Sequence, residues 1–405
     1  MSELEKIDPR ILGGRIAEFR KACGQTQEDI GKHLGMSRPT YIAIEKGTRR
    51  ATPDEIVKLA AYLGRSVHEI VRPTAPTIEL EPHLRAVVDQ SGNGGEEVYD
   101  AIRQLHQFAV DYRELEQAVG AKPLENYPPE IRVPNSKLAE FAEDVATRER
   151  SRLHLGDGPI LELRQNLENN VGVRVFCVPT ASTIAGMYAF VANLGYCILL
   201  NAKHPRERQR WTLAHEYGHF LADRHKPGVD YTRYTERIPA GERFADIFAM
   251  CFLMPATGVR QQYFDVTNSR GDFQVADLCR LANFYAVSVQ AMTLRLESIS
   301  LVRKGTWDTL SEQSFKPETA KRNLQLQPRE DAQWEPYPAR YKSLAVLAFS
   351  EEKLTEGELA KYLRTDRVSA RRIVRDCKNR SDDVDSDGGE AVLRVSLEDS
   401  LLGAS

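Results

Sequence analysis

The sequence predicts a multidomain α+β protein with an all-α head, a body containing a small sheet, and a helical C-terminal region. Residues 10–72 read as short helices separated by Gly, Ser and Pro, whereas β-branched, alternating segments between residues 171 and 201 indicate strands. At about 150 residues per domain, 405 residues favour two to three domains. The apolar (41%) and charged (28%) fractions exclude a collagen-like rod, a coiled-coil rod and a fully disordered chain.

Charge is distributed unevenly along the chain. Residues 10–72 contain twelve Lys and Arg and seven Asp and Glu, a local charge of +5 in a chain whose net charge is −3. The rest of the chain therefore carries −8. A basic head on an acidic body indicates that the head binds nucleic acid.

The head, residues 10–72, carries the sequence signals of two short helices around a tight turn. Thr26-Gln-Glu-Asp29 resembles a capping box that opens a helix ending at Leu34, and Gly35 follows as the C′ residue. Ser37 is expected to cap a second helix, Arg38 to Glu45. This is the plan of a helix-turn-helix, in which the second helix enters the DNA major groove by its N-terminal end.

That docking mode assigns roles to particular side chains of the head. Residues at the start of the second helix are expected near base edges: Arg38, Thr40 and Tyr41. Residues at the start of the first helix and just after the second are expected to contact phosphates: Gln27, Lys46, Thr48, Arg49 and Arg50. The alternative is a small helical dimerisation bundle that does not bind DNA.

The head also resembles the XRE/lambda-repressor family. The resemblance is carried by Gly14-Arg-Ile-Ala-Glu-Phe-Arg20, Gln25-Thr-Gln-Glu-Asp-Ile-Gly31, Leu34-Gly-Met-Ser37 and Ile44-Glu-Lys-Gly47. It implies binding to double-stranded DNA, with a homodimer expected on paired half-sites.

Residues 73–135 are expected to form a helical linker. Apolar residues recur at three- and four-residue steps from Val98 to Val119, and prolines between 123 and 134 stiffen the end of the stretch. Ser136 is expected to cap a helix from Lys137 to Arg150.

In the body, residues 136–300, the spacing of apolar residues changes from a helical pattern to a strand pattern and back. A helix is expected at 160–169, strands at 171–178, 187–192 and 196–201, and helices at about 205–223, 240–254 and 274–299.

His215-Glu216-Tyr217-Gly218-His219 is the sharpest chemical signal. On a helix, residues i and i+4 share one face, so His215 and His219 can bind one zinc ion. A third ligand is needed, and Glu242 at the start of the next helix is the best candidate. Asp246 lies one turn further and suits the second N–H of a ligating histidine. Gly218 lacks a side chain where another element is expected to pass close.

These residues predict metal-assisted amide hydrolysis. Zinc lowers the pKa of its bound water and polarises a carbonyl group. Glu216 is then placed to take the proton as general base and return it to the leaving amine. A site with two His and one carboxylate also accepts Mn²⁺ or Fe²⁺.

Residues 136–300 resemble the ImmA/IrrE metallopeptidases, a zinc-dependent group within the zincins. The resemblance is carried by the strand pair, Arg210-Trp-Thr-Leu-Ala-His215-Glu-Tyr-Gly-His219, Glu242-Arg-Phe-Ala-Asp-Ile-Phe-Ala249 and Phe252-Leu-Met-Pro255. It implies a zincin-like fold with His215, His219 and Glu242 as zinc ligands and Glu216 as catalytic base.

The same resemblance implies a substrate and a way of holding it. The family cleaves repressor proteins with helix-turn-helix domains, and an edge strand aligns the substrate, for which Ala185 to Phe190 is the candidate here. The candidate oxyanion donors are Tyr231, Arg233, Tyr234 and His225. Residues of this kind in a loop more commonly lie on the surface without such a role.

The C-terminal region, residues 301–405, is expected to be an extended connector at 304–340 followed by helices at 341–378. Leu354–Leu363 and Val368–Val374 resemble a helix-turn-helix hairpin to which a strand at 392–397 would add a wing. A helical lid or dimerisation element is the favoured alternative. No internal repeat is evident in the sequence.

The remaining sequence features indicate the cellular compartment of the protein. The chain has no visible secretory signal, and its most apolar stretch, Phe244–Pro255, is too short for a membrane span. Six scattered cysteines without a C-x-x-C pair indicate a reducing cytoplasm.

The working hypothesis is a zinc metalloendopeptidase that cleaves a repressor, or itself within 73–135, in a stress, phage or mobile-element response. Single-stranded DNA is a candidate trigger. The alternatives are a non-proteolytic XRE-type regulator with a structural or sensory metal site, and a toxin–antitoxin or defence component.

Overall fold

The computed structural model describes residues 9–63, 67, 70, 95–191, 195–226, 228–231, 239–327 and 334–382. The chain divides into two compact units, Met1–Thr77 and Ile78–Ser405. Among the described residues, no helix combines the length and the apolar character needed to cross a membrane.

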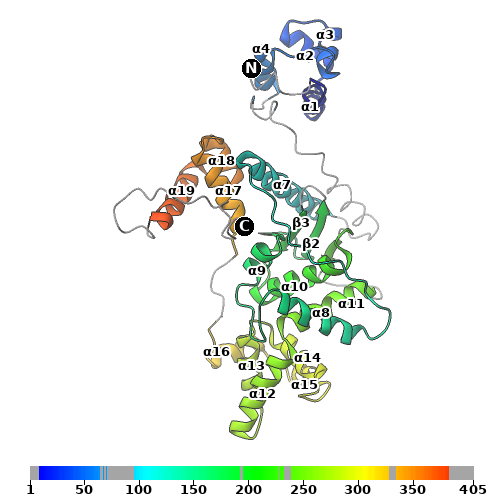
Figure 1. The fold of residues 1–405 in the computed structure, drawn as a ribbon, viewed down its shortest axis with the longest axis vertical. Helices are drawn as coiled ribbons and strands as arrows, with labels where there is room; N and C mark the ends of the chain where they lie inside the picture. Colours follow the sequence, from blue (N-terminus) through cyan, green and yellow to red (C-terminus); the bar gives the residue numbers. More distant parts are fainter. Residues whose placement is uncertain are drawn as a thin grey trace, which may run out of the picture. The chain divides into compact units, whose positions relative to one another are not determined.

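The first unit is a set of short helices around one apolar core (Figure 1). Ile16, Ile30 and Ile56 are completely buried in this core. The helices are α1 (Pro9–Ala22), α2 (Gln27–Leu34), α3 (Arg38–Glu45) and α4 (Pro53–Tyr62).

The turn between α2 and α3 follows the sequence signals. Thr26 and Asp29 form a reciprocal capping box at the start of α2, and Gly35 adopts the left-handed conformation (φ 67°) that ends the helix. Ser37 caps α3 by accepting from the backbone N–H of Thr40. The predicted bounds of both helices are confirmed.

Within the described residues, the second unit contains a four-stranded mixed sheet in the order β1-β3-β2-β4. β1 and β3 are parallel, and β2 runs antiparallel to both of its neighbours. The strands are β1 (Arg174–Val178), β2 (Ile184–Val191), β3 (Gly195–Asn201) and β4 (Gly228–Tyr231).

β4 corrects the expectation that Ala185–Phe190 is an edge strand. β4 pairs with β2, placing Val229 opposite Met187 and Gly228 opposite Tyr188, so this part of β2 is internal. β4 carries little strand signal because it has only four residues, two of which are Gly and Asp.

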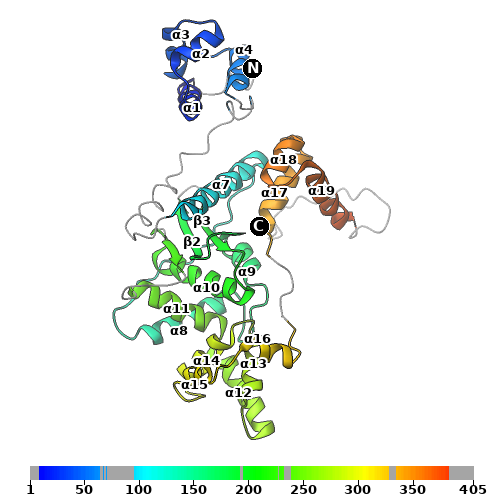
Figure 2. The same ribbon diagram turned by 180° about the vertical axis from the view of Figure 1, so that it is seen from behind.

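Both faces of the sheet are covered by helices, so the second unit has three layers. Successive strand residues point to opposite faces. Val175 and Ile198 face a core that includes α8 (Leu138–Arg152), α10 (Arg206–Asp223) and α11 (Ala240–Leu253). Phe176 and Leu199 face a second core that includes α7 (Glu96–Val119) and α17 (Ala339–Ser350). Figures 1 and 2 show these two groups of helices on opposite sides of the strands.

The stretch expected to be a linker contributes part of this packing. In α7, Phe108 stacks on Phe176 of β1 with ring centroids 4.7 Å apart. Further along, the backbone N–H of Asn126 donates to the carbonyl of Val171, and that of Ile131 donates to Leu221 of α10. Residues 95–135 are therefore packed on the body.

Several element boundaries differ from expectation. Ser136 does not cap α8, because Lys137 occupies the N-cap position with a left-handed backbone and no side-chain cap. The helix expected at 274–299 is broken at Tyr285, after which Ser288 caps a new helix. The connector expected to be extended at 304–340 contains two helices. The strand expected at 392–397 lies outside the described residues. The remaining helices are α9 (Leu163–Asn170), α12 (Ala256–Arg270), α13 (Val275–Phe284), α14 (Val289–Ser298), α15 (Thr306–Glu312), α16 (Pro317–Asn323), α18 (Glu356–Tyr362) and α19 (Arg367–Asp382).

α10 and α11 approach each other closely at Gly218. A Cβ atom at Gly218 would lie 3.0 Å from Cα of Ala245 and 3.2 Å from Cδ1 of Phe248. Only glycine fits this crossing without moving α11. The prediction that Gly218 makes room for another element is confirmed.

The substitution Gly218→Val is expected to destabilise the second unit by about 1–3 kcal/mol, because a branched side chain overpacks the helix crossing. Urea unfolding followed by circular dichroism measures the change. Gly241→Ala is the matched control, since a Cβ there meets only Asp223 Oδ2 at 3.4 Å. Equal midpoints for Gly218→Val and the parent protein would contradict the packing argument.

Candidate functional site

α10 is buried on nearly every side, which fixes the position of its side chains. Completely buried Arg210 holds the helix by donating from Nε to the carbonyl of Ala286 at 3.1 Å and from Nη2 to that of Ile160 at 2.5 Å. Hydrogen bonds from a buried cation to carbonyl oxygens satisfy the charge and fix the helix on its neighbours.

His215 and His219 lie one turn apart on α10, and their Nε2 atoms are 3.1 Å apart. Both side chains are nearly buried, with relative exposures of 4% and 5%. The ring of Tyr188 in β2 stacks on His219 with centroids 5.1 Å apart and an interplanar angle of 14°. The sheet therefore fixes the plane of one imidazole.

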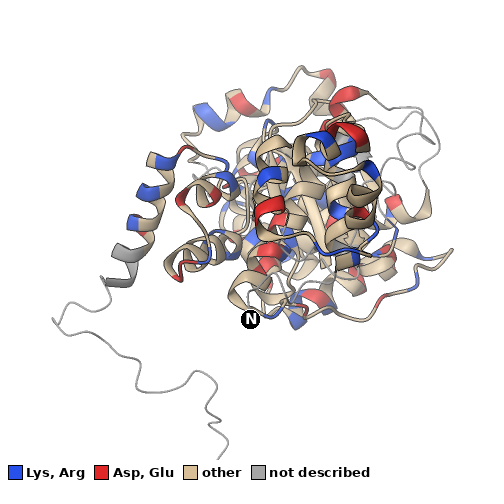
Figure 3. Cartoon of the chain, turned by 90° about the horizontal axis from the view of Figure 1, so that it is seen from above, with Lys and Arg blue, Asp and Glu red and all other residues tan. Residues whose placement is uncertain are grey.

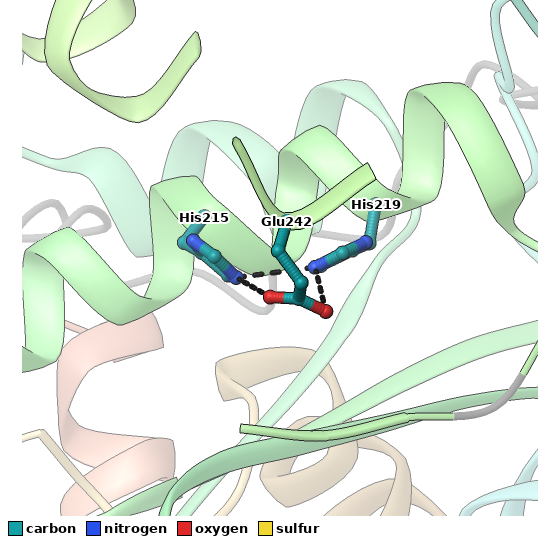
Figure 4. A group of neighbouring side chains, drawn as sticks. All are labelled: His215, His219 and Glu242. Carbon is teal, nitrogen blue, oxygen red and sulfur yellow. Dashed lines mark hydrogen bonds and ion pairs between the residues drawn. The ribbon is translucent and has the colours of Figure 1, made fainter. Parts of the chain in front are cut away.

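Glu242 completes the group from the start of α11 (Figure 4). Its Oε2 lies 3.3 Å from His215 Nε2, and its Oε1 lies 3.4 Å from His219 Nε2. Burial raises the pKa of the Glu242 carboxyl, but hydrogen bonds with the two histidines outweigh burial and hold that pKa well below its usual range. The carboxylate is therefore ionised at neutral pH.

These three residues fit a zinc ion. Their donor atoms all lie within 4.8 Å of one another. Ligands at about 2.0–2.2 Å from a tetrahedral ion are about 3.4 Å apart, close to the separations seen here. Two imidazole nitrogens and one carboxylate oxygen are also a donor set that zinc accepts while retaining a fourth position.

Asp246 lies behind His215, as its spacing from Glu242 suggests. Its Oδ1 is 3.0 Å from His215 Nδ1. A proton on Nδ1 donates to Asp246 and leaves the Nε2 lone pair directed toward Glu242 and His219. Such a carboxylate fixes the tautomer of a ligating histidine and raises its basicity.

Glu216 lies on the sheet side of α10 and is completely buried. Its backbone carbonyl accepts a 3.1 Å hydrogen bond from the hydroxyl of Tyr196. A Cβ at Gly186 in β2 would lie 3.0 Å from Glu216 Oε1, so the absence of a side chain at Gly186 leaves room for this carboxylate. Glu216, which follows His215 in the sequence, therefore lies against β2 and β3.

Tyr188 and Gly186 lie in the strand expected to align substrate, Ala185–Phe190, but the sequence did not predict their contacts with His219 and Glu216. Burial, followed by the charges of Glu216 and Glu242, raises the pKa of Tyr188, so its hydroxyl keeps its proton. Among the expected oxyanion donors, Arg233 and Tyr234 lie outside the described residues, and His225 is exposed with its ring against Phe190. The position of Tyr188 on His219 follows from the packing of β2 against α10.

In the first unit, α3, the second helix of the helix-turn-helix, exposes some of the residues expected to contact DNA and buries another. Arg38, Lys46 and Arg50 are exposed at the two ends of α3 and just beyond it. Tyr41 is completely buried, so the expectation that it reaches a base edge is wrong. Tyr41 is one of the largest side chains of the head's core.

The other expected DNA-contacting residues have partners within the head. Gln27 donates to Glu45 Oε2 at 2.8 Å, and the hydroxyl of Thr48 donates to the carbonyl of Ala43. Arg49 forms two hydrogen bonds with Glu55, at 2.8 and 3.0 Å. The hydroxyl of Thr40 lies 2.8 Å from that of its cap residue Ser37.

Comparisons with known proteins divide the chain in the same way. The peptidase family described as the IrrE N-terminal-like domain matches residues 168–297, and the helix-turn-helix family matches residues 16–70. The first match contains the His215, His219 and Glu242 cluster, and the second contains α2 and α3.

Curated relatives resemble a short part of the chain. An HTH-type transcriptional regulator of Sinorhizobium fredii is 34% identical over 68 residues, which cover 17% of this chain and 88% of that protein. The HTH-type regulator YazB of Bacillus subtilis is 37% identical over 67 residues, 16% of this chain and 97% of that protein. The cryptic phage CTXphi transcriptional repressor RstR of Vibrio cholerae is 27% identical over 79 residues, 19% of this chain and 71% of that protein.

Among solved structures, ComR from Streptococcus suis covers 94% of this chain and 91% of its own length. Its sequence identity is 14% and its TM-score is 0.16, so the similarity supports no inference.

Proposed function

The chain belongs to the helix-turn-helix family of transcriptional regulators and contains an IrrE N-terminal-like peptidase domain, and on that basis we propose that it is a DNA-binding zinc metalloendopeptidase that regulates transcription by cleaving a repressor protein. The observation that carries the proposal is the convergence of His215, His219 and Glu242, together with the buried Glu216 that follows His215 in the sequence.

His215, His219 and Glu242 would hold the zinc ion, with Asp246 orienting His215. When bound, the ion supplies Lewis acidity, which acidifies water and polarises a carbonyl group. Mn²⁺ and Fe²⁺ remain chemically acceptable to the same donors.

The chain's own residues supply the proton transfers and the positioning. Glu216 accepts the proton of the attacking water and returns it to the leaving amine, as a general base and then a general acid. Tyr188 fixes the plane of His219 by stacking. Burial keeps the hydroxyl of Tyr188 protonated.

A separate repressor protein is favoured as the substrate over the chain itself. A peptidase cleaves extended backbone, whereas residues 96–119 form the packed helix α7. Residues 126 and 131 are hydrogen-bonded to the body. Self-cleavage within the described part of 73–135 would therefore require unpacking of the second unit.

The test is a cleavage assay with the full chain, zinc and a candidate helix-turn-helix repressor, with and without single-stranded DNA as trigger. Zinc-dependent fragments that disappear on chelation support the proposal. Absence of cleavage across repressors and triggers, in protein that binds one zinc per chain, would contradict it.

A second function is favoured by one observation, the burial of the centre. His215, His219 and Glu216 are at most 5% exposed, whereas the side chain of Glu242 is 24% exposed. A largely buried donor set suits a non-proteolytic regulator with a structural or sensory metal. Regulation that survives Glu216→Gln but not Arg38→Ala would identify this second function.

DNA binding by the head is tested by Arg38→Ala. Since Arg38 is exposed at the start of the recognition helix, its loss is expected to weaken operator binding by about 1–3 kcal/mol. Fluorescence anisotropy at fixed salt, on an operator selected from random duplexes by the parent protein, measures the effect. Lys58→Ala on α4, which removes an exposed cation away from α3, is the control. Equal affinities for Arg38→Ala and the parent would exclude a base contact by Arg38.

A further inference from the structure

The helices α18 and α19 repeat the backbone pattern of α2 and α3. In both pairs, a threonine caps the first helix through a reciprocal capping box, Thr26 with Asp29 and Thr355 with Glu358. Adding 329 to a residue number of the first pair gives the equivalent residue of the second. The sequence shows no evident repeat because few residues are identical under this shift.

The turns between the helices are equivalent under the same shift. Gly35 has φ 67° and its equivalent Arg364 has φ 48°, so both turns pass through the left-handed region at the same position. The N–H of Gly35 donates to the carbonyl of Lys32 at 3.2 Å, and that of Arg364 donates to the carbonyl of Lys361 at 3.1 Å. A left-handed backbone at an arginine is uncommon, and here it serves the same turn as the glycine.

The caps of the second helices also correspond. Ser37 accepts from the backbone N–H of Thr40, and its equivalent Asp366 accepts from the backbone N–H of Ser369 at 2.9 Å. Asp366 also accepts from the hydroxyl of Ser369 at 2.6 Å. The helices α3 and α19 are therefore capped in the same way after their turns.

Buried positions correspond as well. Ile30 and its equivalent Leu359 are completely buried, as are Tyr41 and its equivalent Ala370. α17 lies before α18 in the chain, as α1 lies before α2, and contributes Leu344 to the same core. Residues 339–382 thus have the core, turn and caps of a helix-turn-helix.

The outer face of α19 is strongly basic. Arg367, Arg371 and Arg375 recur every four residues along one stripe, and Arg372 lies beside it; all four are exposed. Figure 3 shows the Lys and Arg bands along this helix. Arg367 occupies the position of Arg38 in the head.

The side of residues 339–382 that faces α7 makes contacts with that helix. Arg364 donates to Asp111 at 2.9 Å, and the hydroxyl of Tyr362 donates to Glu114 at 2.7 Å, both in α7. These contacts fix α18 and the turn on the body, and they involve none of the arginines of the α19 stripe. Val368 beside the stripe is 73% exposed, an apolar side chain of the kind that contacts the methyl group of thymine.

We propose that residues 339–382 form a second helix-turn-helix that binds double-stranded DNA, with the arginine face of α19 in the major groove. The matching turn and caps provide the docking geometry. Arg367, Arg372 and Arg375 supply the phosphate and base-edge contacts, while Arg371 pairs with Glu356 of α18 at 2.8 Å. One chain would then hold two DNA segments, one with each unit.

The test uses the full chain with the head disabled by Arg38→Glu and Lys46→Glu, and a fluorescent 24-base-pair duplex of mixed sequence at low salt. We expect this chain to retain binding. Adding Arg367→Gln and Arg372→Gln is expected to weaken that binding at least tenfold and to reduce the slope of log affinity against log salt by about 2. The control is Arg303→Gln with Lys304→Gln, which removes two exposed cations that lie outside residues 339–382.

A second measurement uses the parent head. An immobilised operator duplex saturated with parent protein is expected to capture a free labelled duplex, and the Arg367→Gln, Arg372→Gln variant is expected to lose this capture while its head still binds the operator. A head-disabled chain that binds no duplex would overturn the proposal, as would binding that the two α19 substitutions leave unchanged. If the substitutions instead abolish self-association of a chain that binds no duplex, the face is a dimer interface.

Discussion

Replacing Glu216 by glutamine is expected to lower the rate of peptide cleavage by about 10²- to 10⁴-fold while leaving zinc bound. The amide side chain has the size of the glutamate side chain and fits the same space beside Gly186, but it does not accept a proton. Because the ligand groups of His215, His219 and Glu242 are untouched, the zinc content should remain at one ion per chain. Fragment formation from a candidate repressor and metal analysis of the same samples measure the two effects.

Glu207→Gln is the control for this substitution. Glu207 lies on the same helix but pairs with Lys321, away from the metal centre. Its loss is expected to leave cleavage within twofold of the parent rate, since a partly exposed ion pair contributes at most about 1 kcal/mol to stability. Identical fragment patterns for Glu216→Gln and the parent would remove the hydrolytic role of Glu216.

Replacing Glu242 by alanine is expected to weaken zinc binding by more than about 100-fold, because it removes the anionic member of the three candidate ligands found among the described residues. Asp246→Asn is expected to cost less, about 10- to 100-fold, because Asp246 acts only through the ring of His215. Competition with a chelator of known zinc affinity ranks the two variants.

Arg243→Ala is the matched control on α11, since this exposed residue lies beside Glu242 in sequence. It should bind zinc like the parent protein. Unchanged zinc affinity in Glu242→Ala would show that the third ligand comes from elsewhere. A larger loss in Asp246→Asn than in Glu242→Ala would reverse the roles assigned to the two carboxylates.

The parts of the site that lie within a single helix could be predicted from the sequence. A helix places residues four apart on one face, so the proximity of His215 to His219 follows from their spacing. The same rule relates Glu242 to Asp246. The glycine that lets the two helices cross, Gly218, is also visible, because it interrupts the side chains of an otherwise buried helix.

The contributions of the sheet could not be predicted in the same way. Tyr188 and Gly186 reach the centre only because β2 packs under α10, and a strand's register against a helix has no periodic signature in the sequence. The burial of Tyr41 was hidden for a related reason: an amphipathic aromatic residue on a short helix suits either the core or a groove of DNA.

The sequence of residues 354–374 resembles a helix-turn-helix hairpin, but its residue-by-residue correspondence with α2 and α3 could not be predicted from it. The left-handed turn residue is Gly35 in one unit and Arg364 in the other, and the second cap is Ser37 in one and Asp366 in the other. Each pair uses different side chains to satisfy the same backbone groups. The φ angles, the backbone hydrogen bonds and the buried positions together reveal that the two backbones are equivalent.

The face of the sheet formed by Phe176, Met187 and Leu199 is covered by α7 and α17, two helices more than 200 residues apart in the chain. On the ribosome, the four described strands and the three candidate metal ligands emerge before α17 does. A chain that ends before residue 339 would therefore leave the part of this apolar face that α17 covers exposed to solvent.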